Sequence, residues 1–204
     1  MANPTGAFGA RPVRHFDGSP WNGATVPCYV SAEYGVALFI GDGVLISPTT
    51  AERHAGGLMP TINVAPGTTT TIIRGFITSF DPLPDNLTQI YNPAYTERIA
   101  NVCMDPSVVF EIRGNAATTS CDADYIWSNA GLIATASGST ITGLSGYHLD
   151  EGTTTTPAAD IDLPLLIVGI SSRSDNELAA STIYEVVLNT FWANTGQVLG
   201  VLGA

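Results

Sequence analysis

The sequence predicts a mainly β protein, an antiparallel β-barrel or β-sandwich with long loops, an extended N-terminal arm and little helix. Short apolar runs with the two-residue period of a strand recur along the chain, and no run of ten or more residues shows a helical period. Segments rich in Gly, Pro, Ser and Thr separate these runs. The 204 residues, 45% of them hydrophobic, are enough for one large domain with a core.

The stretch from Arg98 to Asn115 is the centre of this prediction. The apolar run Ile99–Met104 stops at Asp105-Pro106, and residues 108–113 then alternate between apolar and polar positions. Proline fixes its own φ and disfavours a helical residue before it, so the break is sharp. We expect two strands that meet at a corner.

Residues 1–25 are expected to form the extended arm, ahead of a β-rich core over residues 26–195 and a short tail over residues 196–204. Gly and Pro recur every few residues in the arm, which argues against a long helix or a continuous strand. Its aromatic residues are too apolar for a solvated tail. The arm either lies on a neighbouring subunit or folds back onto its own domain. The candidate interface residues are Phe8, Arg11, Arg14, Phe16 and Trp21.

The next segments predict three strands and a loop. The strands are expected at residues 28–30, 36–40 and 44–47, with a tight turn at Gly41-Asp42-Gly43 and a loop over residues 48–60.

The rest of the chain predicts further strands joined by polar connections. Residues 68–81 form the longest β-branched stretch, with a bulge or bend at Gly75. The other expected strands are residues 131–136, 163–171 and 182–191, the last with Tyr184, Val186 and Leu188 on one face. The expected connections are a rigid one at 81–86, a polar excursion at 114–130, long loops or a projecting hairpin at 137–160, and a turn at 174–177.

Charge and cysteine content limit the partners and the compartment. The chain has no lysine, and seven arginines face eighteen acidic residues, for a net charge of −11, which disfavours nucleic-acid binding. Cys28, Cys103 and Cys121 are widely spaced, as expected for reduced, buried thiols. There is no signal-peptide pattern and no apolar run long enough to span a bilayer. We expect a soluble protein made in a cytoplasm, with neither nucleic acid nor membrane as a partner.

No motif predicts catalysis, a metal or a cofactor. Residues 143–148 (G-L-S-G-Y-H) invite a serine-hydrolase interpretation, but a nucleophile elbow requires Gly where Tyr147 stands. The three histidines are far apart, and the pairs Asp122/Asp124 and Asp160/Asp162 lack a calcium-loop pattern. We therefore expect a protein that is not an enzyme.

The central stretch resembles a known family. Asp105-Pro106 followed by Val109-Phe110-Glu111-Ile112 resembles the D-P-x-x-x-F-E-I/V segment of structural proteins encoded beside capsid genes in many tailed bacteriophages. Further matching pieces are Asn3-Pro4 to Arg11-Pro12, Ser145 to Asp150, Leu166 to Ile170 ahead of Asp175-Asn176-Glu177, and Glu185 to Asn189. Arg113 stands where the family pattern has Gln.

The resemblance is to head-decoration, or cement, proteins, and it implies a function. Such proteins are β-rich dimers or trimers on the outer surface of the capsid, where they bind the major capsid protein and have no catalytic residues. It implies that this chain stabilises a phage capsid by bridging neighbouring subunits. The alternatives are another virion component, such as a head fibre, tail protein or host-surface adhesin, and a β-sandwich carbohydrate-binding module or enzyme.

Overall fold

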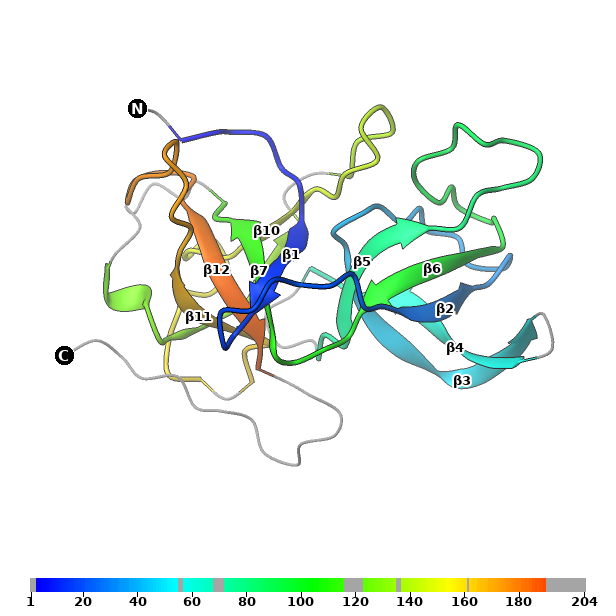
Figure 1. The fold of residues 1–204 in the computed structure, drawn as a ribbon, viewed down its shortest axis with the longest axis horizontal. Coiled ribbons are helices and arrows are strands. Elements are labelled where there is room, and N and C mark those ends of the chain that lie inside the picture. Colours follow the sequence, from blue (N-terminus) through cyan, green and yellow to red (C-terminus); the bar gives the residue numbers. More distant parts are fainter. Residues whose placement is uncertain are drawn as a thin grey trace.

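The computed structural model describes residues 3–54, 57–67, 72–115, 123–134, 137–160 and 162–189. These residues form a closed β-barrel beside an open β-sheet (Figure 1), so the prediction of a mainly β fold is confirmed. The barrel consists of β2 (Val26–Val30), β3 (Gly43–His54), β4 (Gly57–Val64), β5 (Gly75–Phe80) and β6 (Arg98–Cys103). The sheet consists of β1 (Ala10–His15), β7 (Val108–Arg113), β8 (Asn129–Ala130), β11 (Leu165–Ile170) and β12 (Ile183–Leu188). A small pair, β9 (Leu132–Ala134) and β10 (Tyr147–Leu149), and a 3₁₀ turn, η1 (Ala123–Tyr125), complete the described elements.

The barrel closes in the strand order β2-β4-β3-β5-β6. All its pairs are antiparallel except β2 with β4, which meet in parallel at Tyr29 and Thr61. Its interior is filled by apolar side chains, among them Val30, Leu38, Val44, Ile62, Ile77 and Val102. Cys28 and Cys103 are buried free thiols, as expected, and burial raises the pKa of Cys28 to about 12 and that of Cys103 to about 11. Cys121 lies outside the described residues.

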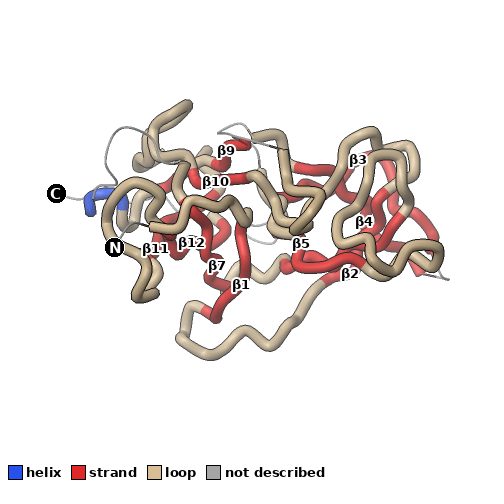
Figure 2. Tube along the Cα trace, turned by 90° about the horizontal axis from the view of Figure 1, so that it is seen from above, coloured by secondary structure: helices blue, strands red, loops and turns tan. Residues whose placement is uncertain are grey.

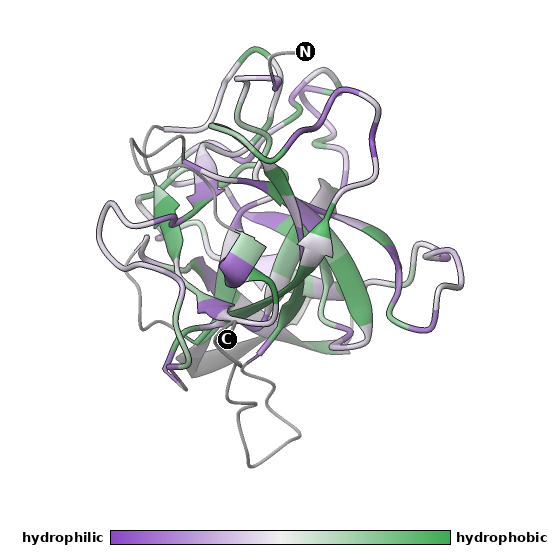
Figure 3. Ribbon diagram, turned by 90° about the vertical axis from the view of Figure 1, so that its left-hand side faces the viewer, coloured by the Kyte–Doolittle hydropathy of each residue, from purple (hydrophilic) through white to green (hydrophobic). Residues whose placement is uncertain are grey.

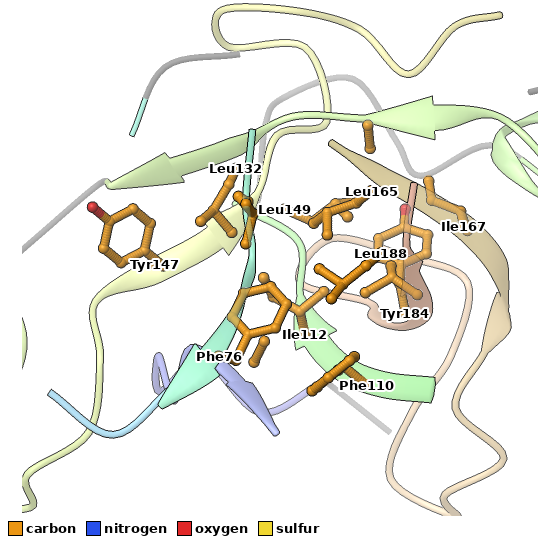
Figure 4. Packing of buried hydrophobic residues seen from close by; sticks show 14 of the residues in the cluster. Phe76, Phe110, Ile112, Leu132, Tyr147, Leu149, Leu165, Ile167, Tyr184 and Leu188 are labelled. Carbon is orange, nitrogen blue, oxygen red and sulfur yellow. The ribbon is translucent and has the colours of Figure 1, made fainter. Parts of the chain in front are cut away.

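The sheet has the order β1-β7-β12-β11-β8, with every pair antiparallel. The expected face of Tyr184, Val186 and Leu188 is confirmed, because all three are buried in the core that the sheet shares with the barrel. Figure 4 shows Tyr184 and Leu188 in the same cluster as Phe110 and Ile112 of β7. The strands carry most of the hydrophobic colour in Figure 3, and the loops around them are paler or hydrophilic.

The predicted corner joins the two parts. β6 ends the barrel at Cys103, and β7 starts the sheet at Val108. Between them, Asp105 Oδ1 accepts hydrogen bonds from the backbone N–H and the hydroxyl of Ser107, at 2.8 and 2.7 Å. Across the junction, the ring of Phe76 on β5 packs against Phe110 on β7 with centroids 4.9 Å apart (Figure 4).

Part of the expected arm pairs with the sheet of its own domain. Residues 10–15 form β1, an edge strand whose pairing with β7 runs from Ala10 opposite Ile112 to His15 opposite Val108. For this segment the structure favours the second alternative, an arm that folds onto its own domain. The position suits Pro12, because an edge strand tolerates a residue without a backbone N–H. The expected tail at 196–204 and the last residues of the expected core lie outside the described residues.

Two further strand predictions are corrected. Residues 36–40 form no strand; Leu38 and Ile40 instead make isolated bridges to Asn92 and Leu144. In the expected loop at 48–60, residues 48–54 belong to β3 and residues 57–60 to β4, which pair antiparallel; residues 55–56 lie outside the described residues. Polar residues there gave no strand signal, because backbone hydrogen bonding across a hairpin does not depend on side-chain polarity. The long connection at 137–160 includes strand β10, while the predictions near β5, β9, β11 and β12 are confirmed in place.

Gly41 is expected to be required where the N-terminal segment crosses the barrel. It has a φ of +92°, and a Cβ there would lie 2.5 Å from the Phe8 carbonyl oxygen. The Ala10 N–H also donates to the Gly41 carbonyl at 3.0 Å. Gly41→Ala should therefore lower the free energy of unfolding by about 2–4 kcal/mol, from backbone strain and the clash together. Denaturant unfolding measures this. Gly6→Ala, where a Cβ meets nothing within 4 Å, is the control, and equal effects of the two substitutions would contradict the prediction.

Candidate docking surface

The two arginines of the predicted arm lie on the outer face of their own sheet. Arg11 Nε donates to Glu111 Oε2 at 2.9 Å, and Arg14 pairs with Glu185 at 2.5 Å. Glu111 and Glu185 stand opposite each other on neighbouring strands, where like charges repel. A register shift at Val13, a β-bulge, brings both arginines to this face. The two ion pairs therefore neutralise Glu111 and Glu185, here called the acidic row, with arginines of the same chain.

The three aromatic residues of the arm also make contacts within the chain. Phe8 lies under the Arg11 guanidinium, 4.8 Å from its ring centroid, and Trp21 packs against the shared core. Phe16 meets Trp127 edge to face, with centroids 6.3 Å apart, and remains 53% exposed. Of the five predicted interface residues, Phe16 is thus the one with more than half of its surface available to a partner.

A different surface gathers on the barrel side of the molecule. Residues 34–41, 86–96 and 137–147, here called the loop layer, run side by side. Leu38 and Asn92 exchange two backbone hydrogen bonds of 2.8 Å, and the Ile40 N–H donates to the Gly143 carbonyl at 2.9 Å. The Tyr95 N–H donates to the Tyr34 carbonyl at 2.8 Å. All three segments lie on the upper side of the molecule in Figure 1 and face the viewer in Figure 2.

Arg98 holds the middle segment of the loop layer in place. From β6, its guanidinium donates to the backbone carbonyls of Asp81, Gln89 and Tyr91 at 2.6–2.8 Å. It also lies over the Phe80 ring at 5.2 Å. One buried side chain thereby satisfies three carbonyls of a connection that has little regular structure, which fixes the shape of the loop.

The loop layer is uncharged and exposes large apolar side chains. Its three segments contain no Asp, Glu, Lys or Arg, in a chain with a net charge of −11. Ile141 is 87%, Leu87 77% and Tyr95 71% exposed, and Val36 and Ile90 are also exposed. Protein interfaces are depleted of charge at their cores and enriched in aromatic residues, and exposed apolar patches mark them.

Tyr95 has an unusual backbone conformation for an exposed aromatic residue. Its φ is +58°, in the left-handed region that Gly and Asn favour. Trp127, also exposed, has a φ of +66°. Such conformations cost free energy and are maintained only where the surroundings impose them, and they cluster at functional positions.

A pocket of about 530 Å³ opens between the first and third segments of the loop layer. Asp42, which is buried, is one of its lining residues, and the Oδ2 atom of Asp42 accepts the Phe39 N–H at 2.8 Å. Burial raises the pKa of Asp42 to about 6, against the opposing effect of hydrogen bonds from Ser145 and Phe39. The pocket is otherwise lined by Val36, Ala37, Phe39, Val64, Ala134, Ser137, Gly138, Thr140, Gly146 and Tyr147.

The serine and histidine of the 143–148 motif have other contacts. Ser145 hydrogen-bonds Asp42, and its Oγ accepts the Tyr147 N–H at 3.1 Å. His148 is buried against Arg113, whose guanidinium donates to His148 Nε2. Burial and this neighbouring cation lower the pKa of His148 to about 4. The imidazole is therefore neutral at physiological pH and serves as an acceptor for a buried arginine.

Sequence reasoning missed the loop layer. Two signals were available: the absence of charge from each of its segments, and isolated apolar residues within polar loops. The contacts that join the segments span more than fifty residues and leave no local pattern.

The comparisons with known proteins give no family. No protein-family model matches the chain, and neither does any curated protein or solved structure. Within the described residues, no helix has the length and apolar character needed to cross a membrane, and no three His, Cys, Asp or Glu side chains are grouped to hold a metal ion.

Replacing Arg98 tests whether it holds the loop. Arg98→Met keeps an apolar stem over Phe80 and removes the three hydrogen bonds, so we expect a loss of about 2–4 kcal/mol in the free energy of unfolding. The Asn92 and Tyr95 amides should also lose protection in hydrogen exchange. Arg74→Met, on a half-buried arginine before β5, is the control. Unchanged protection of these two amides in Arg98→Met would contradict this role.

His148 and Asp42 are expected to have opposite effects on how stability depends on pH. Between about pH 6.5 and about pH 4, the unfolded chain protonates His148 and the folded chain does not, so this residue's contribution to stability falls as the pH drops. Between about pH 6 and pH 3.8, the folded chain protonates Asp42 and the unfolded chain does not, so the contribution of Asp42 to stability rises as the pH drops. On acidification, His148→Gln should therefore lose stability less steeply than the wild type, and Asp42→Asn more steeply. Denaturant unfolding from pH 7 to about pH 4 measures both slopes, and equal slopes in the three proteins would refute the assignment.

Proposed function

We propose that this chain is a non-enzymatic virion protein that decorates and stabilises a phage capsid, docking on the major capsid protein through the loop layer. The observation that carries the proposal is the concentration of exposed apolar side chains in three adjacent, uncharged loops. The resemblance of the central segment to head-decoration proteins supports the choice of partner.

The distribution of charge supports a docking role for this face in particular. On the outer sheet face, Arg11 and Arg14 are paired with carboxylates of their own chain. A partner that docked there would have to replace or desolvate these pairs, which is costly. The loop layer has no ionic groups to desolvate, so burying it against another protein releases water from apolar surface at little electrostatic cost.

A protein that binds the assembled capsid, and not its free subunits, stabilises the capsid by that binding. A protein that contacts two neighbouring capsid subunits binds the intact lattice better than free subunits, and it shifts the equilibrium toward the lattice by mass action. Several loops on one face allow contacts on both sides of a joint. The proposed location is the outer surface of the capsid.

Self-association into a dimer or trimer is part of the proposal. Phe16 and Trp127 form an exposed aromatic pair at the sheet, away from the loop layer. Aromatic side chains are frequent interface anchors, so this pair is the candidate contact between copies.

Two substitutions in the loop layer test the docking. Leu87→Ser removes an apolar side chain that is 77% exposed, and Tyr95→Asn places a residue that tolerates the left-handed region at φ +58°. We expect both variants to bind at least about tenfold more weakly to undecorated capsids of the phage that carries this gene, because an interface anchor is worth about 1.4 kcal/mol or more. Co-sedimentation measures this binding. Tyr95→Asn should also keep or raise the free energy of unfolding, so misfolding would not explain its loss of binding.

The matched control is Leu178→Ser, an exposed leucine on the sheet side of the molecule. It should bind capsids like the wild type. Equal binding by all four proteins would overturn the proposed docking face. Sedimentation with phage tails or host cells, and not with capsids, would overturn the capsid role in favour of an adhesin.

A further inference from the structure

The pocket beside the loop layer has a feature that apolar docking does not use, a buried carboxyl group. We propose that this pocket receives a lysine or arginine side chain of the docked partner, with Asp42 as its counter-ion. The capsid protein as the source of that side chain rests on the proposed function. The preference of the pocket for a cation on an aliphatic stem does not depend on the proposed function.

The carboxyl group of Asp42 is only partly satisfied by its own chain. Asp42 is 3% exposed, and its described donors are the Phe39 N–H and the Ser145 hydroxyl. A carboxylate offers about four acceptor positions, so two donors leave room for more. Within the described part of the chain, no arginine or histidine forms an ion pair with Asp42. A buried carboxylate without a counter-ion is costly, and a cation that enters the pocket offsets that cost.

The chain is poorly supplied with cations for this role. It has no lysine, and five of its seven arginines have other partners. Those five are Arg11, Arg14, Arg98, Arg113 and Arg173. A cation at Asp42 is therefore best supplied from outside the chain.

The walls of the pocket suit the rest of a basic side chain. Lys and Arg carry apolar stems that bury well along apolar surface, and this pocket offers Val36, Ala37 and Val64. The rings of Phe39 and Tyr147 also line it, and aromatic faces attract cations. Its volume of about 530 Å³ lies within the range of pockets that enclose small ligands.

The position and charge of the pocket link it to docking. Val36 both lines the pocket and stands exposed in the loop layer, so a partner on that surface lies over the pocket mouth. The net charge of −11 favours approach by a basic surface. A metal ion is the less suitable occupant, because Asp42 is the only carboxylate among the lining residues and hydroxyl groups such as those of Ser137 and Thr140 are weaker ligands for a hard cation.

The primary test uses n-butylammonium as the probe and n-pentanol as its neutral counterpart. Both are titrated into the full chain and followed through the backbone amide NMR signals of Phe39, Asp42 and Gly146. We expect these amides to shift with n-butylammonium at about tenfold lower concentration than with n-pentanol. Equal responses to the two probes, or shifts confined to other parts of the chain, would overturn the inference. This comparison needs no variant.

A matched pair of variants then identifies the counter-ion. Asp42→Asn keeps the side-chain shape and an oxygen for the Phe39 N–H, and it should lose the tenfold preference for the cation. Asp85→Asn removes the same charge from an exposed site on the loop before the middle segment, and it should keep the preference. If Asp42→Asn keeps the preference, Asp42 is not the counter-ion and the inference fails.

Capsid binding separates this inference from the proposed function. A loss in both Asp42→Asn and Tyr95→Asn supports the two together. A loss in Tyr95→Asn alone supports docking and overturns the basic side chain in the pocket. A pocket that prefers the cation in a chain that does not bind capsids supports the pocket chemistry and overturns the capsid as the partner.

Discussion

The contact between Phe76 and Phe110 is the constraint on which the rest of the structure depends. One ring belongs to a barrel strand and the other to a sheet strand, and they meet within one continuous core. Neither part closes that core alone, because the sheet needs the barrel to cover its apolar face. The turn at Asp105-Pro106 connects the barrel to the sheet at this contact. Gly41 allows the N-terminal segment to cross the barrel close to its backbone.

The loop layer shows how a surface without regular secondary structure can be held in shape. Its segments are tied by a few backbone bridges, by the guanidinium of Arg98 and by the carboxyl group of Asp42. Both charged groups are directed inward and serve as anchors, and the side chains left outside are apolar. A surface held in one shape loses less conformational entropy when it binds a partner.

Sequence reasoning succeeded where apolar and polar residues alternate along a strand. The alternation in residues 108–113 and 182–191 gave β7, β12 and the corner at Asp105-Pro106. The alternation located β7 correctly, but it implied a single buried face, whereas all six residues of β7 are buried. Sequence reasoning failed for β1, where the bulge at Val13 interrupts the period and Pro12 argues against a strand. It also failed for the loop layer, because segments far apart in sequence meet there through backbone bridges that carry no side-chain pattern. The interface residues that it placed in the arm rested on composition, which does not show whether an aromatic residue meets its own chain or another.

The bulge at Val13 also bears on how sequences of this kind can change in length. The segment from Gly9 to His15 is fixed at both ends, because Gly9 lies close to Gly41 and His15 pairs with Val108. Only its present number of residues places Arg11 and Arg14 on the same side of the sheet. Loss or gain of a single residue there would turn one arginine toward the core and leave a glutamate of the acidic row unneutralised. At the tips of the loop layer, the number of residues does not decide which face of a sheet a side chain occupies. Insertions and deletions should therefore accumulate at the tips and be purged from β1, so that the loop layer can vary while the sheet stays the same length.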